Sequence, residues 1–203
     1  MGPETSLDIA LRPVTTYKDV NSVVGQLLEV ARQQLRLKLG VPEAMGLSLA
    51  EVAENTIDHA QTATPGIVCA QTYKKVNEVE FAIVDCGVGI LASASAVPAL
   101  VGASDREAIE WALTLGATSK PGPHTGYGLF MTKRMIESNK GTMWVYSGGG
   151  MARITHSGVQ LMSVSSWPGT VVTLRFNTSR AISVQEVLEQ DFGVEAESEQ
   201  LWG

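Results

Sequence analysis

The sequence has few cysteines, few aromatic residues and no recognisable targeting segment. Among its 203 residues there are two cysteines, Cys69 and Cys86, and aromatic residues make up only 6%. Two cysteines cannot form a disulfide framework, which excludes the small disulfide-stabilised secreted domains and is typical of a reducing compartment. The first ten residues lack a basic flank followed by an apolar stretch, so we expect no signal peptide. These absences predict a cytoplasmic protein.

Positive charge is also scarce. The chain has 15 Lys and Arg residues against 21 Asp and Glu residues, and six of the acids lie after residue 177 with a single arginine. Neither that segment nor the rest offers the basic stripe that is typical of nucleic-acid binders. The uncharged segment 86–104 has the length of a membrane span, but its glycines, proline and serines favour a flexible loop. We therefore expect no nucleic-acid partner and no membrane partner.

Hydrophobic periodicity predicts a mixed α and β structure. The helical patterns cover 20–40, 42–60, 105–115 and 128–138, and the strand patterns cover 7–14, 67–73, 79–84, 142–147, 154–164 and 170–176. The glycines at 148–150 indicate a loose turn. Consecutive strands at the C-terminal end predict an α+β two-layer sandwich, with a mixed, largely antiparallel sheet and helices on one face. We expect one domain over 1–178 and an acidic, mobile tail over 179–203 that holds at most a short helix at 184–189.

The helix predicted over 42–60 has an unusual polar stripe. Glu51 and Asn55 are four residues apart, so both side chains point the same way, and the stripe contains no lysine or arginine. A carboxylate beside an amide oxygen would suit a water-bearing Mg²⁺ site, because Mg²⁺ prefers oxygen ligands. A solvated helix face is the alternative interpretation.

Two further motifs carry glycines beside polar groups. Asp85 ends an apolar strand and is followed by Gly87 and Gly89, which allow close backbone approach to a ligand. The run Gly126-Tyr127-Gly128-Leu129 opens a predicted helix, whose N-terminus presents free backbone N–H groups and so favours an anion. Each motif alone is also compatible with an ordinary turn.

The order of these motifs resembles the GHKL ATPase family, which includes DNA gyrase, histidine kinases, mismatch-repair proteins and a class of heat-shock chaperones. The elements are E-x-x-x-N on a helix, D-x-G-x-G after a strand, a long loop, G-x-G-L at a helix start and Gly169-Thr170 before the last strand. The resemblance covers about 35–176 and implies the Bergerat ATP-binding fold, with ATP and Mg²⁺ as cofactors.

The resemblance also implies a role for each matching residue. Asn55 would bind Mg²⁺, Asp85 with Thr170 would bind the adenine amino group, and Gly87 and Gly89 would line the adenine and ribose side. Residues 91–125 would form the lid over ATP, in which Lys120 would contact the γ-phosphate. The main chain of Gly126, Tyr127, Gly128 and Leu129 would hold the phosphates, and Glu51 would act as general base.

Within the family, the sequence resembles the anti-sigma-factor serine kinases, whose motif E-x-x-x-N-x-x-x-H-A also matches His59 and Ala60. The only other histidines, His124 and His156, lie inside the ATPase region, so we expect no complete histidine kinase here. We also expect none of the further domain that follows in gyrase and the chaperones. The resemblance implies a bacterial, ATP-binding regulator that phosphorylates or sequesters a protein partner, such as a sigma factor, an anti-anti-sigma-like protein or another regulator.

Three alternatives stay open at this point. The protein could be a Ser/Thr protein kinase or anti-sigma-type switch, a nucleotide-gated binding module without turnover, or a histidine kinase catalytic domain acting in trans. The resemblance leaves a monomer and a homodimer through the first strand equally open.

Overall fold

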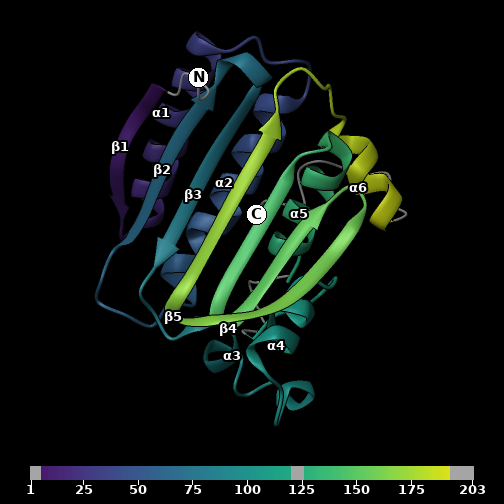
Figure 1. Ribbon diagram of the computed structural model, residues 1–203. Coiled ribbons are helices and arrows are strands. Elements are labelled where there is room, and N and C mark those ends of the chain that lie inside the picture. The colour runs from purple at the N-terminus through teal and green to yellow at the C-terminus, as the bar shows by residue number, and fades with distance from the viewer. Residues whose placement is uncertain (1–5, 120–125, 193–203) are drawn as a thin grey trace.

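The computed structural model describes residues 6–119 and 126–192, which form a sheet with helices on one side (Figure 1). The strand order is β1-β2-β3-β5-β4, and every neighbouring pair is antiparallel. The strands are β1 (Ser6–Val14), β2 (Gly66–Tyr73), β3 (Glu78–Asp85), β4 (Thr142–Thr155) and β5 (Gly158–Asn177). The predicted α+β two-layer class is confirmed, and the sheet of the described residues is wholly antiparallel rather than mixed.

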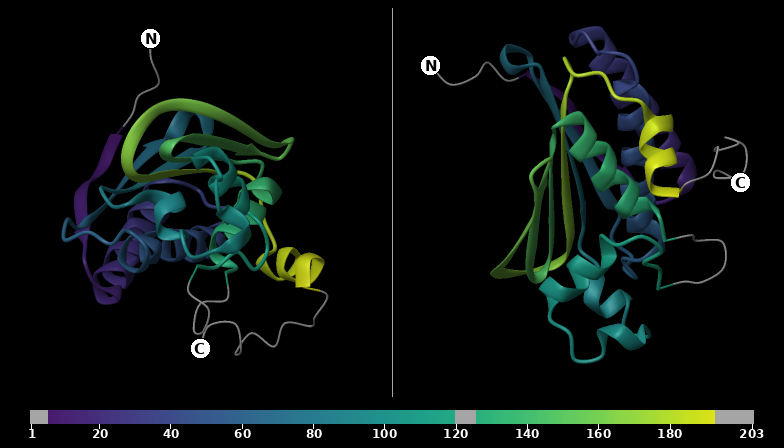
Figure 2. Two further views of the ribbon diagram at one scale, coloured as in Figure 1. Left: turned by 90° about the horizontal axis from the view of Figure 1, so that it is seen from below. Right: turned by 90° about the vertical axis from the view of Figure 1, so that its right-hand side faces the viewer.

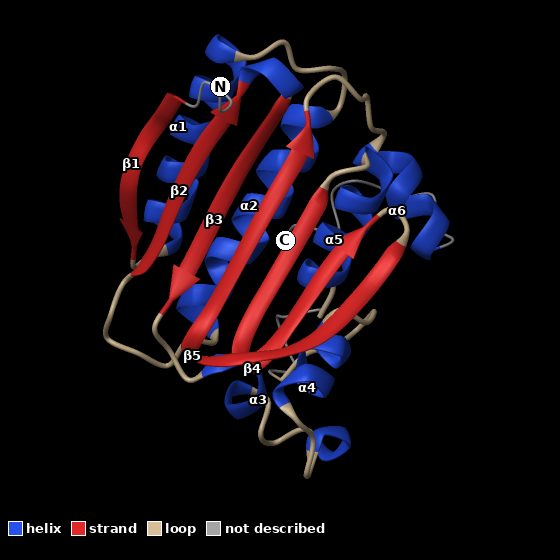
Figure 3. Cartoon of the chain, in the orientation of Figure 1, coloured by secondary structure: helices blue, strands red, loops and turns tan. Residues whose placement is uncertain are grey.

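The helices lie in two places relative to the sheet (Figures 1 and 3). The helices behind the sheet are α1 (Tyr17–Gln34), α2 (Val41–Asp58) and α5 (Gly128–Asn139), with α6 (Val184–Phe192) beside α5; α3 (Gly89–Ser93) and α4 (Asp105–Ala112) lie at one end of it. Short 3-10 turns cover Lys74–Val76 and Pro98–Leu100. None of the helices among the residues placed by the structure is both long and apolar enough to cross a bilayer.

The core fills the space between the sheet and the helices. Burial alternates residue by residue along β2 and β3, so one face of each strand meets the helices. The helix α2 contributes its apolar stripe, with Met45 and Leu49 fully buried. The largest fully buried side chains also include Phe81, Phe176, Leu27, Ile83, Ile109, Ile136, Met143, Ile154 and Leu174. The opposite, polar stripe of α2 is therefore left to face the pocket described below.

The glycines at 148–150 do not form a loose turn, so that prediction was wrong. The strand β4 continues through them, with shifts in register, and the expected strands 154–164 and 170–176 are one long strand, β5. A Cβ on Gly150 would lie 2.8 Å from the backbone nitrogen of Arg106, and the Gly149 N–H donates to Asp105 Oδ2 at 2.8 Å. The glycines are needed because the start of α4 packs directly on the strand.

Two other expectations need correction. The segment 86–104, expected as a flexible loop, contains α3 and a 3-10 turn, and its Ala94 and Leu100 are buried against Ala108 of α4. The segment after residue 178, expected as a tail, contains α6, which extends further than predicted. Ile182, Val184, Val187 and Leu188 are buried in the main core. These apolar residues recur at helical spacing, and so α6 has a face that packs on the domain. The expected mobility of 193–203 lies outside the described residues.

Candidate functional site

A pocket opens between α2, the end of β3, the middle of β5, the short helix α3 and the start of α5. Its empty volume is about 1050 Å³, open mouth included. Of the residues singled out in the sequence, those lining it are Glu51, Asn55, His59, Ala60, Asp85, Gly89, Gly126, Tyr127, Gly128, Leu129 and Thr170. Gly87 lies next to the pocket without lining it, and Lys120 lies outside the described residues. Motifs that are up to 119 residues apart in the chain, as Glu51 and Thr170 are, therefore meet in one cavity.

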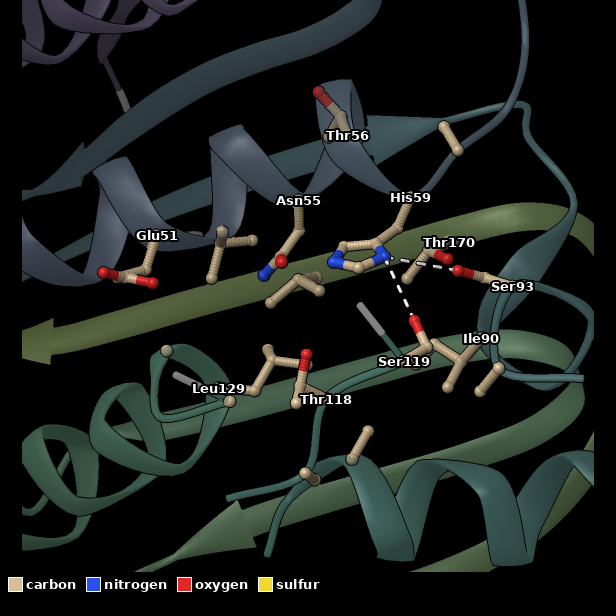
Figure 4. Close-up of a pocket in the computed structure, with 18 of the residues that line it drawn as sticks. Glu51, Asn55, Thr56, His59, Ile90, Ser93, Thr118, Ser119, Leu129 and Thr170 are labelled. Carbon is tan, nitrogen blue, oxygen red and sulfur yellow. Dashed lines mark hydrogen bonds between the residues drawn. The ribbon is translucent and has the colours of Figure 1, made fainter. Parts of the chain in front are cut away.

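The polar stripe of α2 forms one wall of the pocket. Glu51, Asn55 and His59 follow one another at successive turns and face the cavity (Figure 4). On the other side of the helix, Leu49 and Ala53 are buried in the core. The stripe is thus a pocket wall rather than an ordinary solvated face.

Glu51 lies where α2 meets the first residue of α5. A Cβ on Gly128 would overlap the Glu51 carboxylate and would lie 3.1 Å from its Cδ, so a larger residue there would force the glutamate side chain to move. Burial, with Glu54 and Asp58 nearby, raises the pKa of Glu51 above its usual 4.5. A carboxyl group with a raised pKa is a better proton acceptor than an ordinary surface glutamate.

Asp85 is the buried acid of the site. It ends β3 directly opposite Thr170 of β5, and it is 6% exposed. Its Oδ1 accepts hydrogen bonds from the N–H of Gly87 at 2.8 Å and from the N–H of Thr170 at 3.2 Å. Burial raises the pKa of Asp85, while these hydrogen bonds act in the opposite direction. Gly169, the residue before Thr170, has φ +96°. A Cβ on Gly169 would overlap the backbone carbonyl group of Asp85.

The two glycines after Asp85 hold the chain against its neighbours. A Cβ on Gly87 would lie 2.6 Å from Ala60 Cα, and the N–H of Val88 donates to the Ala60 carbonyl at 2.9 Å. Gly89 has φ +78° and begins α3. Gly87 is therefore required by the close approach of the Ala60 backbone, and Gly89 by its left-handed backbone conformation.

The start of α5 closes another side of the pocket. Gly126 has φ +72°, and a Cβ there would lie 2.7 Å from the carbonyl carbon of Gly116. Tyr127 is the N-cap residue and contributes no side-chain cap, and Gly128 is the first helical residue. The first N–H groups of a helix have no partner within the helix, so this end suits an anionic ligand.

Several residues in or beside the pocket belong to none of the sequence motifs. Ser147 is buried; its Oγ accepts from the N–H of Ile90 at 2.8 Å and donates to the Gly169 carbonyl at 3.3 Å. Ser93 Oγ and Ser119 Oγ lie 3.4 and 3.5 Å from Nδ1 of His59 (Figure 4). These serines come from distant segments, so no local pattern signals them; His59 alone could be found, from its helical spacing after Asn55.

The described residues contain no group of three or more His, Cys, Asp or Glu side chains that could hold a metal ion. Any metal bound beside Asn55 would therefore need oxygen ligands from water or from another bound molecule. Mg²⁺ commonly takes only one or two protein oxygens and completes its shell in this way.

Comparison with known families matches residues 40–180, which is more than half of the chain and includes every motif of the pocket. The matching family is described as histidine kinase-, DNA gyrase B- and HSP90-like ATPase. A comparison with curated proteins finds no match. The domains of this family bind ATP, generally together with Mg²⁺. The chain belongs to the family of histidine kinase-, DNA gyrase B- and HSP90-like ATPases.

Proposed function

We propose that the protein is an ATP-dependent regulator that phosphorylates a serine or threonine of a protein partner. The observation that supports this most directly is the pair Glu51 and Asn55, one turn apart on α2 and both facing the pocket that Asp85 lines. The partner would be a sigma factor, an anti-anti-sigma-like protein or another regulator, as the resemblance to anti-sigma-factor kinases suggests.

The residues of the pocket fit a nucleotide. Asp85 offers a buried carboxylate to an adenine amino group, supported by Thr170, and the glycine-rich start of α5 offers backbone N–H groups to phosphates. Gly87 and Gly89 keep the chain beside Asp85 in close contact with its neighbours. Asn55 would contribute the protein oxygen for Mg²⁺. When bound, Mg-ATP would supply the γ-phosphoryl group for transfer.

Glu51 would act as the general base. Its raised pKa favours acceptance of the proton from a partner's hydroxyl group as that oxygen attacks the γ-phosphorus. The bond from the γ-phosphorus to the bridging oxygen would break in the same step, and ADP would leave. The neighbouring Asn55 would hold the metal that neutralises phosphate charge. A module that used ATP only to change conformation would have no need of a carboxylate at this position.

The test is phosphoryl transfer in the Glu51→Gln variant. Wild-type protein, γ-labelled ATP, Mg²⁺ and lysate are incubated, and the labelled partner and residue are mapped. Glutamine keeps the shape of the side chain but cannot accept a proton, so we expect ATP binding to persist while transfer falls by roughly 10²–10⁴-fold. Glu43→Gln, an exposed change in the first turn of the same helix, is the matched control and should transfer normally.

A denaturation series shows whether the variant is folded. The raised pKa means that ionised Glu51 opposes folding at neutral pH, so Glu51→Gln should be at least as stable there as the wild type. This difference in stability should disappear below pH 4.5, where the glutamate is protonated in both the folded and the unfolded protein. Unchanged transfer in a folded Glu51→Gln variant would contradict the base assignment. Absence of transfer in the wild type with its partner present would favour a nucleotide-gated binding module.

A further inference from the structure

Two buried hydroxyl groups, one on α2 and one on α5, are not used by the proposed mechanism. Ser48 and Thr132 are each 1% exposed, and neither Ser48 Oγ nor Thr132 Oγ1 has a hydrogen-bond partner among the described residues. A hydroxyl group inside a helix often bonds to a carbonyl of the preceding turn, as that of Thr56 does to Ala53 at 2.8 Å. Because a buried hydroxyl group without a hydrogen bond costs free energy, these two groups need an explanation.

The helices that carry them run antiparallel. Gly128, the first residue of α5, lies against α2, and a Cβ on it would be 3.5 Å from Glu51 Cβ. At the other ends, Gly40 precedes α2 and Asn139 ends α5, and both contact the segment 177–182. The start of α5 therefore lies beside the second half of α2, and the end of α5 lies near the start of α2.

The two hydroxyl groups lie at the same level, one helical turn behind Glu51. Ser48 precedes Glu51 by three residues and Thr132 follows Gly128 by four, so each shares a helix face with the residue at the contact. Side chains on a helix lean toward its N-terminus, so Glu51 leans toward Ser48, and Thr132 leans toward Gly128. The two hydroxyl groups and the Glu51 carboxylate therefore converge between α2 and α5.

We infer that Ser48, Thr132 and the Glu51 carboxylate bind one buried water molecule, which holds this carboxylate in place at the pocket. The water would accept from both hydroxyl groups and donate to the carboxylate. Three hydrogen bonds to polar groups without other partners are typical of a buried water. Leu49 and Met131, the next residues on the two helices, are buried in the main core, so the surroundings of this water are otherwise apolar.

Double-mutant cycles in urea denaturation test the water site, and they need no nucleotide. Ser48→Ala and Thr132→Val each remove one hydroxyl group, and Glu51→Met removes the carboxylate. With Glu51 present, we expect each hydroxyl variant to raise the unfolding equilibrium constant about tenfold, because the buried carboxylate loses hydrogen bonding. In the Glu51→Met background the same changes should be neutral or stabilising, since no carboxylate remains to be supported.

Thr178→Val is the matched control for these cycles. Thr178 is also 1% exposed, but its Oγ1 donates to the Asn77 carbonyl at 2.9 Å, away from the pocket. This variant should have the same effect with Glu51 and with Glu51→Met. Equal effects of Ser48→Ala and Thr132→Val in the two backgrounds would overturn the inference. A gain in stability with Glu51 present would also overturn it, because hydroxyl groups that bind nothing are better replaced by apolar groups.

The catalytic consequence rests on the proposed function of Glu51 as general base. Ser48 and Thr132 would then be positioning residues, so Thr132→Val should lower kcat of phosphoryl transfer about tenfold and leave KM for ATP unchanged. Thr132→Ser keeps the hydroxyl group and should restore kcat. A loss that Thr132→Ser does not restore would come from packing and would contradict the positioning role. Absence of transfer in the wild type would contradict the proposed function, whereas the denaturation cycles would still decide whether the water site exists.

Discussion

Asp85 and Glu51 lie in environments that disfavour their own charge. Burial raises the pKa of both carboxyl groups, and neither faces a cation among the groups that shift its pKa. A side chain that opposes folding in this way is more typical of a functional site than of a structural one. The two acids also differ in their surroundings. Asp85 is held by backbone N–H groups, whereas Glu51 lies against Gly128 beside two other acids.

The role proposed for Asp85 predicts the effect of Asp85→Asn. Asparagine can still accept the N–H groups of Gly87 and Thr170 through Oδ1, so the fold should persist. Its NH₂ group would then meet the adenine amino group, donor against donor, and a mismatch of this kind is worth about 1–3 kcal/mol. We expect ATP affinity measured by titration calorimetry to fall by roughly tenfold or more. Asp191→Asn, which alters an ion pair with Arg134 outside the pocket, should leave it unchanged. Unaltered ATP affinity in Asp85→Asn would contradict the proposed adenine contact.

At the scale of elements, the contact between α4 and β4 depends on glycine rather than on an apolar side chain. Ser104 caps α4 with a reciprocal capping box, so the helix start was correctly expected from the sequence. Its position on the sheet is set by the lack of side chains on Gly148 and Gly150 and by the hydrogen bond from Gly149 to Asp105. This contact joins the segment after α3 to the long hairpin.

Gly150→Ala should therefore be destabilising although alanine is a small residue. Its Cβ would lie within 3.0 Å of backbone atoms of Asp105 and Arg106, which cannot move as a flexible side chain could. We expect a loss of about 1–3 kcal/mol in the free energy of unfolding, measured by urea denaturation. Gly25→Ala, in α1 with no atom within 4 Å of the new Cβ, should instead be neutral or stabilise by up to about 1 kcal/mol. Equal stability of the two variants would show that α4 does not pack on β4 in this way.

At the scale of the whole molecule, α6 packs the segment that follows residue 178 onto the ATPase domain. Val187 and Leu188 are buried in the main core, and Arg134 of α5 donates from Nε to Asp191 Oδ2 at 2.7 Å. This hydrogen bond, partly offset by burial, raises the pKa of Arg134. The compact unit among the described residues therefore extends well past residue 178.

Truncation of Leu188 tests this extension of the domain. Leu188→Ala should lower the free energy of unfolding by about 2 kcal/mol, the low end for a buried leucine, because the site lies at the edge of the core. Glu186→Ala, an exposed change in the same helix, should have little effect. A mobile tail would give the same urea midpoint for both variants, and this result would contradict the packing of α6.

The sequence by itself determined most of the elements, the fold class and the motifs of the pocket. Alternation predicted β2 and β3, helical spacing predicted α2 and its polar stripe, and the order of the motifs indicated the ATPase family before any contact was known. These features are local or follow from residue order, so they can be read along the chain. Glu51 and Asn55 share a face simply because they are four residues apart on a helix.

Tertiary structure alone decided which distant segments complete the site and the core. Thr170 donates to Asp85 from 85 residues away, and Ser147 bonds to Ile90 from 57 residues away. Glycines 148–150 carry a local signal for a turn, yet they form a strand because a helix packs on them. Likewise, the sequence did not show what the apolar face of α6 packs against, and only the assembled core shows it. Contacts of this kind depend on how the layers pack together, and periodicity along the chain contains no information about that packing.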